Sequence, residues 1–134
     1  MELVTMHTHT NYTGHGHGTV AELVDAAAAA KLGAIAVTEH YPMSAAMDPD
    51  NVVSMAWDRL PDYLIDIAAA AAAHPEMQVT PGCEIDWLGA QEDRDFSALD
   101  FSNFIHVLGS VHYLDGWAFD DPAQEARWHD VGVD

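Results

Sequence analysis

Short apolar runs alternate with helix-forming segments along this chain, and this alternation constrains its fold more than any other feature. The runs expected to form strands cover residues 3–6, 34–38, 77–80 and 104–111. Helices are expected from residue 19 to about residue 31, and from residue 61 to residue 73. Strands and helices in alternation are typical of parallel sheets, because each parallel connection needs a crossover. The order therefore predicts an α/β protein, either an open parallel sheet or a barrel.

Capping residues mark the limits of the two expected helices. Residues 19–22, Thr-Val-Ala-Glu, have the pattern of a capping box, which predicts that the first helix begins at its threonine. Lys31 suits the last turn of that helix, and Gly33 is expected to end it. Pro61 suits the first turn of the second helix, and Pro75 stops that helix.

Residue types that bind metals stand at the carboxyl end of every expected strand. His7 and His9 follow the first strand, His40 the second, Glu84 the third and His112 the fourth. In α/β barrels the active site forms at this face, so residues far apart in the sequence would meet there. His7 and His9 are two residues apart, so both imidazoles would point to the same side of an extended strand. Together these residues predict a metal site.

Each of these residues also has a purely structural explanation. His15 lies in a glycine-rich segment, residues 14–18, whose backbone can approach a ligand closely, although a solvated loop would look the same. His40 could be a structural histidine at a strand end. Glu84 ends an apolar run, where burial of an unpaired carboxylate is costly unless a metal or cation removes the cost. Surface or structural positions are expected for the remaining histidines: His17, His74, His106 and His129.

The charge balance restricts the class of partner. The chain has 22 acidic and 4 basic residues, a formal net charge of -18, which repels nucleic acids and anionic membranes. A phosphate ester would be repelled as well, unless bound metal ions make the site itself positive. Cys83 is the single cysteine, so no internal disulfide framework is expected. No apolar run is long enough to span a bilayer and the N-terminus lacks the blocks of a signal peptide, so we expect a soluble, cytoplasmic protein.

The segments that carry these residues resemble the PHP (polymerase and histidinol phosphatase) superfamily, and in particular its histidinol-phosphate phosphatases. The matching segments are residues 7–10, 14–16, 38–40, 82–86 and 109–112. Residues 114–120 also resemble the segment after the last histidine in that subgroup. The order, spacing and flanks of the segments agree over nearly the whole chain.

The resemblance implies a distorted β/α barrel that carries up to three divalent metal ions, of zinc, iron or manganese. By position, it assigns six residues to the metals: His7 and His9 to the first, Glu84 to a bridge between the first and the second, His112 to the second, and His15 and His40 to the third. Glu84 is also the residue to which a catalytic role is assigned.

The resemblance also implies more ligands than this sequence contains. Members of the family carry a histidine in a Gly-His context and an Asp-x-His motif further downstream. Complete barrels of this kind need about 250 residues. We therefore expect residues 1–134 to be a single PHP domain truncated at its C-terminus, a partial barrel with the first four or so strands, in which each metal lacks one protein ligand.

For the complete protein, the resemblance implies metal-dependent hydrolysis of a small phosphorylated substrate. L-histidinol phosphate is the expected substrate, which would give L-histidinol and phosphate in histidine biosynthesis, with no nucleic acid or membrane as partner. One alternative is a PHP-type nuclease, nucleotide phosphatase or polymerase-associated domain, but these usually have a Ser/Asp-Gly pair where this chain has Gly14-His15-Gly16. The other alternative is a non-catalytic metal-binding module.

Overall fold

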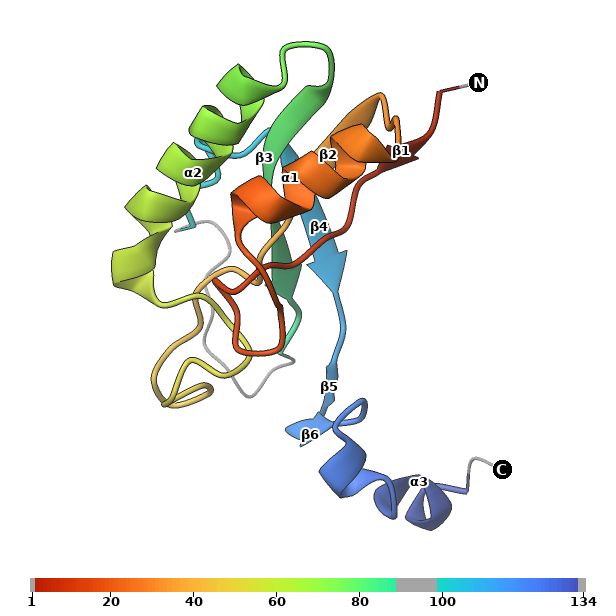
Figure 1. The fold of residues 1–134 in the computed structure, drawn as a ribbon. Coiled ribbons are helices and arrows are strands. Elements are labelled where there is room, and N and C mark those ends of the chain that lie inside the picture. The colour runs from red at the N-terminus through yellow and green to blue at the C-terminus, as the bar shows by residue number, and fades with distance from the viewer. Residues whose placement is uncertain (1, 89–98, 133–134) are drawn as a thin grey trace. The chain divides into compact units, whose positions relative to one another are not determined.

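A four-stranded parallel sheet with the order β1-β2-β3-β4 organises the structure, a computed structural model that describes residues 2–88 and 99–132 (Figure 1). Its strands are β1 (Val4–Thr5), β2 (Ala34–Val37), β3 (Gln78–Asp86) and β4 (His106–Ser110). In the register of the sheet, Val4 lies beside Ala34, which lies beside Gln78. The predicted α/β class, with the first four strands of a partial barrel, is confirmed.

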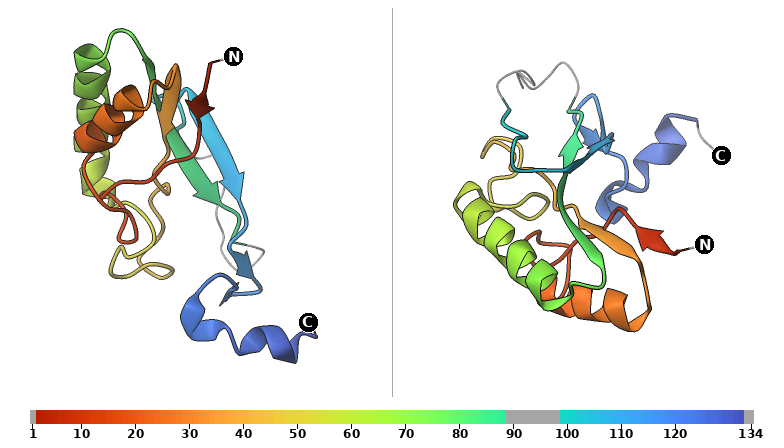
Figure 2. Two further views of the ribbon diagram at one scale, coloured as in Figure 1. Left: turned by 45° about the vertical axis from the view of Figure 1, so that its right-hand side comes forward. Right: turned by 90° about the horizontal axis from the view of Figure 1, so that it is seen from above.

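Two helices cover one face of this sheet (Figure 2). α1 (Val20–Ala29) begins after Thr19, whose side chain and that of Glu22 form the predicted capping box. α2 (Leu60–Ala73) follows a short 3-10 helix, η1 (Trp57–Arg59), and has a proline in its first turn as predicted. Buried residues recur at helical spacing in both helices: Val20, Val24 and Ala27 in α1, and Tyr63, Ile67 and Ala70 in α2.

The end of α1 differs from the prediction. Lys31, with φ of 60°, takes the left-handed conformation after the helix, and the N–H groups of Lys31 and Leu32 bond to carbonyls of the last turn at 2.9 and 3.1 Å. This is the hydrogen-bond pattern of a Schellman motif. Gly33 already belongs to the sheet, since its N–H bonds to the carbonyl of Leu3 and its carbonyl accepts from Gln78. The prediction that Gly33 ends the helix was therefore wrong.

The third strand is longer than predicted, and a tyrosine fills a gap beside it. β3 continues through Pro81 to Asp86, so Glu84 lies inside the strand, and its pairing with the chain after β2 resumes only at an isolated bridge from His40 to Glu84. In the gap, the hydroxyl of Tyr63 lies 2.7 Å from the carbonyl of Val37 and 2.8 Å from that of Gly82. Backbone groups that lose their strand partner thereby keep a hydrogen bond.

The chain divides into two compact units, Met1–Ile85 with Asp100–Leu108, and Asp86–Leu99 with Gly109–Asp134. The first unit holds both long helices. The second contains an antiparallel hairpin of β5 (Tyr113–Leu114) and β6 (Trp117–Ala118), then the short helices η4 (Pro122–Gln124) and α3 (Arg127–Asp130). Within the residues that the structure describes, no helix combines the length and apolar character that a membrane crossing requires.

Candidate metal centre

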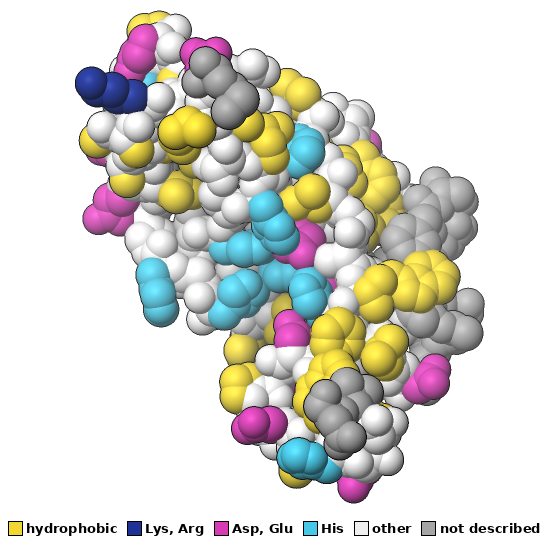
Figure 3. Space-filling view, turned by 90° about the vertical axis from the view of Figure 1, so that its right-hand side faces the viewer, with side chains coloured by type: hydrophobic (Ala, Val, Ile, Leu, Met, Phe, Trp, Pro, Cys, Tyr) yellow, Lys and Arg dark blue, Asp and Glu magenta, His cyan; other side chains and the backbone are white. Residues whose placement is uncertain are grey.

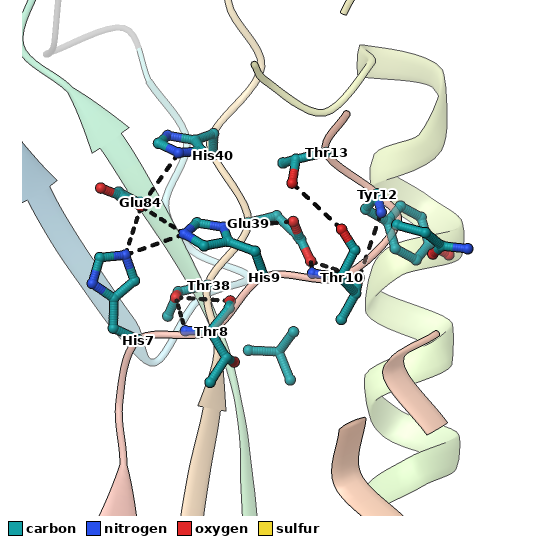
Figure 4. Close-up of polar contacts among 12 residues, drawn as sticks. His7, Thr8, His9, Thr10, Tyr12, Thr13, Thr38, Glu39, His40 and Glu84 are labelled. Carbon is teal, nitrogen blue, oxygen red and sulfur yellow. Dashed lines mark hydrogen bonds and ion pairs between the residues drawn. The ribbon is translucent and has the colours of Figure 1, made fainter. Parts of the chain in front are cut away.

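The segment that carries His7 and His9 is fixed by a pair of threonines. Although β1 ends at Thr5, the N–H of Thr8 donates to the hydroxyl oxygen of Thr38 at 2.9 Å, and the Thr38 hydroxyl donates to the carbonyl of Thr8 at 3.1 Å (Figure 4). The Thr8 hydroxyl donates in turn to a carbonyl of β2. These side-chain bonds extend the pairing of the first two strands and place both imidazoles at the carboxyl edge of the sheet.

His7, His9 and Glu84 converge on a single point. The Nε2 atom of His7 lies 2.8 Å from Oε2 of Glu84, that of His9 lies 3.1 Å from the same oxygen, and the two Nε2 atoms are 3.2 Å apart. Nitrogen and oxygen ligands about 2.0–2.1 Å from a zinc ion would lie about 3.3 Å apart at tetrahedral angles. The spacing of these three atoms therefore fits a shared divalent cation, and the three residues form one of the groups that could hold such an ion.

A second group of possible ligands consists of His9, His15 and His40. The rings of His9 and His40 are stacked with centroids 4.8 Å apart, and His15 lies edge-on to both at 5.1 Å. His40 also approaches Glu84, with 3.6 Å between Nε2 and Oε2. Figure 3 shows histidine side chains gathered on one face of the molecule. The loop histidine and the strand-end histidine are thus brought together, although 25 residues separate them in the sequence.

The glycines beside His15 are needed for close approach, but to the chain itself. A Cβ atom on Gly16 would lie 1.9 Å from the carbonyl oxygen of Thr10, and one on Gly14 would lie 2.4 Å from that of Val52. Both contacts are with backbone, so a side chain at either position would displace the loop. The approach of this backbone to a ligand, which the sequence suggests, stays a prediction.

His112 lies in the second unit and is paired there. Its Nδ1 atom contacts Oδ1 of Asp86, a carboxylate that is 1% exposed and also accepts from the hydroxyl of Ser110 at 3.0 Å. This pairing directs the other ring nitrogen of His112 away from Asp86. The assignment of His112 to a metal stays a prediction. Among the other histidines, His17 is exposed as expected, and His74 caps the end of α2.

Comparison with known proteins identifies the family. Residues 5–131 match the family model described as PHP domain. This chain belongs to the PHP domain family. It is also 33% identical over 129 residues to a protein of Deinococcus radiodurans described as a "probable histidinol-phosphatase". That alignment covers 96% of this chain and 49% of the relative, so the chain spans about half the length of the curated relative it matches.

In this PHP domain, a buried carboxylate that the sequence did not assign to the site lies beside His9. Glu39 is completely buried, and its Oε1 atom accepts both the N–H and the hydroxyl of Thr10 at 2.6 Å each. Its Oε2 atom lies 3.7 Å from Nδ1 of His9. A signal was present in the sequence, because Glu39 follows a strongly apolar strand, where a carboxylate without partners would be costly to bury.

The electrostatics of the PHP domain site couple its imidazoles to its carboxylates. Burial lowers the pKa of His9, but the nearby carboxylates of Glu39 and Glu84 outweigh that effect and raise it to about 9. The pKa of His15 is lowered, by burial and then by its neighbours His40 and His9. Imidazole and carboxylate donors of this kind suit zinc, iron and manganese. The site thus offers ligands for a cation and two carboxylates to balance its charge.

Proposed function

We propose that this chain carries a large part of the metal centre of a phosphatase that hydrolyses a small phosphate monoester. The observation that supports the proposal best is that the Nε2 atoms of His7 and His9 converge on one carboxylate oxygen of Glu84. They do so in a PHP domain whose relative is described as a probable histidinol-phosphatase. The substrate proposed is L-histidinol phosphate, which would yield L-histidinol and phosphate in histidine biosynthesis in the cytoplasm.

The donor atoms suggest which residues would hold each metal ion. His7 and His9 would hold one divalent ion through Nε2, His15 and His40 would hold another, and Glu84 would connect neighbouring ions through its carboxylate, with His112 as a further ligand. Ions bound there would provide a water molecule of lowered pKa and positive charge for the phosphoryl oxygens. Up to three ions of zinc, iron or manganese are proposed.

The chain's own charge makes bound cations necessary for such a substrate. A net charge of -18 repels phosphate, and Glu39 and Glu84 add negative charge at the site itself. Neutral imidazoles hold a cation without cancelling its charge, so the local field can become positive in an acidic protein. The same argument disfavours a nucleic acid, whose many phosphates would also meet the acidic surface.

The test is phosphate release from L-histidinol phosphate by the purified chain, stripped by a chelator and reloaded with Mn²⁺, Zn²⁺ or Fe²⁺. Turnover that needs metal and is lost in His7→Ala and Glu84→Gln is the expected result. His15→Ala should lower bound metal, whereas His17→Ala is the matched control from the same loop and should change nothing. Metal binding without turnover would instead support a non-catalytic metal-binding module. Absence of bound metal would overturn the proposal.

A further inference from the structure

We propose that Glu39 is a positioning residue for the metal centre, which accepts a hydrogen bond from Nδ1 of His9 and so directs Nε2 of His9 to the cation. The inference rests on the proposed metal centre but assigns a role to a residue that binds no metal itself. None of the groups of described residues that could share a cation includes Glu39.

The two atoms concerned face each other without other partners. Oε1 of Glu39 is occupied by two hydrogen bonds from Thr10, whereas Oε2 is buried and has no hydrogen-bond partner. Nδ1 of His9 is likewise buried and lacks one. The separation of 3.7 Å is too long for a hydrogen bond, but a shift of about 1 Å would bring it to the usual length. Leaving two such buried groups unpaired is costly, so a state in which they pair is favoured.

The chemistry of imidazole explains why metal binding would favour a hydrogen bond between Nδ1 of His9 and Oε2 of Glu39. A neutral imidazole carries one N–H, and the other nitrogen has the lone pair that a metal needs. In His9 it is Nε2 that faces His7 and Glu84. Nδ1 must then carry the proton, and the carboxylate oxygen that lies near it is Oε2 of Glu39. A carboxylate in this position fixes the tautomer and the orientation of the ring and makes the ligand more basic.

A purely structural role for Glu39 explains the burial of Oε1 but not that of Oε2. The bonds from Thr10 explain why Oε1 is buried at the end of β2, because they anchor the start of the loop that carries His15. They do not explain why Oε2 is buried beside His9. A substitution that changes Oε2 but keeps an acceptor at the position of Oε1 can therefore distinguish a role in holding the loop from a role in orienting His9.

Glu39→Gln makes this change, because it keeps one oxygen acceptor and replaces the other oxygen with an NH₂ group. The amide oxygen can still accept from Thr10, but the NH₂ group would face Nδ1 of His9 as a donor and would favour the tautomer with its proton on Nε2. Removal of a partner of this kind lowers metal affinity about 10- to 100-fold, and we expect this loss when Zn²⁺ is titrated into the variant by calorimetry. Melting curves of the metal-free variant should show that it is folded at the temperature of the titration. Asp66→Asn is the control, because it makes the same carboxylate-to-amide change at a residue that bonds to Tyr12. It should leave Zn²⁺ affinity nearly unchanged.

A second readout does not depend on the variant. In the wild-type chain labelled with ¹⁵N-histidine and loaded with Zn²⁺, the His9 resonances should show a protonated Nδ1 and a metal-bound Nε2. Binding through Nδ1, or equal Zn²⁺ affinity in wild type and Glu39→Gln, would overturn the inference and leave the metal centre intact. If wild type binds no Zn²⁺, the metal centre fails and the inference fails with it.

Discussion

Thr10 donates both its backbone N–H and its hydroxyl to a single oxygen of Glu39, at 2.6 Å each. Both residues are completely buried. The pair joins the segment after His9 to the end of β2, so the first loop and the second strand hold each other in place. One oxygen of a buried carboxylate thereby fixes the backbone, while the other remains directed toward an imidazole.

Thr38→Val should weaken metal binding at the proposed centre without changing any of the proposed ligands. The substitution removes the hydroxyl that accepts from the N–H of Thr8 and donates to its carbonyl, the bonds that hold His7 and His9 at the sheet edge. We expect a loss of about 1–3 kcal/mol in the free energy of unfolding, measured by urea denaturation, and weaker binding of Zn²⁺. Thr80→Val, at another buried threonine of the sheet, is the control for the side-chain change. Equal Zn²⁺ affinity in wild type and Thr38→Val would show that the threonine pair does not position the histidines.

Tyr63→Phe tests the hydroxyl that fills the gap beside β3. Its loss leaves the carbonyls of Val37 and Gly82 without this partner in a buried region. Unfolding in urea should show a loss of about 1–3 kcal/mol, typical of buried groups left unsatisfied. Tyr12→Phe is the matched control, because its hydroxyl bonds to Asp66 on α2 at a partly exposed site and should cost less. Similar costs for the two variants would contradict this account.

Gly16→Ala should displace the loop that carries His15. The added Cβ would meet the carbonyl oxygen of Thr10 at 1.9 Å, and backbone atoms cannot move aside as a flexible side chain can. The expected results are a lower melting temperature and a lower metal stoichiometry by elemental analysis. Gly109→Ala serves as the control, since nothing lies within 4 Å of its added atom. Unchanged stoichiometry in Gly16→Ala would mean that His15 holds no metal.

Metal binding should release a proton from His9 near neutral pH. Its pKa of about 9 in the metal-free chain means that the ring is protonated at pH 7, whereas a ligand must be neutral. The apparent affinity for Zn²⁺ should therefore increase about tenfold per pH unit between pH 7 and pH 8.5 and level off above pH 9. Calorimetry in buffers of different ionisation enthalpy measures the protons released. No release at pH 7 would contradict the assignment of His9 as a ligand.

The contact between α1 and the end of α2 should make stability depend on pH. Nε2 of His74 lies 2.7 Å from Asp25, and the hydrogen bonds to Asp25 and then to Glu76 raise the pKa of His74 above its ordinary 6.5. A group whose pKa is raised by folding stabilises the native state below its unfolded pKa and loses that effect as the pH rises through the folded value.

Asp25→Asn should therefore lower the melting temperature at pH 6 and have little effect at pH 9. Asp50→Asn, on an exposed loop residue, makes the same change in charge and is the control. An equal decrease at both pH values would show that the histidine charge does not contribute.

Local chemistry made several features predictable from the sequence. The capping box at Thr19 involves residues within one turn, so it needs no tertiary information. Pro61 likewise marks the first turn of α2 through its own fixed backbone. The convergence of His7, His9 and Glu84 could be foreseen because parallel strands end at one edge of a sheet.

The sequence by itself thus determined the α/β order, the helix starts and the edge at which the metal-binding residue types collect. The tertiary structure decided that Lys31 rather than Gly33 ends α1, that Tyr63 fills the gap beside β3, and that Glu39 faces His9. The reason is one of distance along the chain. The first group of features depends on neighbours within a few residues or on the general direction of strands, whereas the second depends on which backbone and side-chain atoms from distant segments meet once the core is packed.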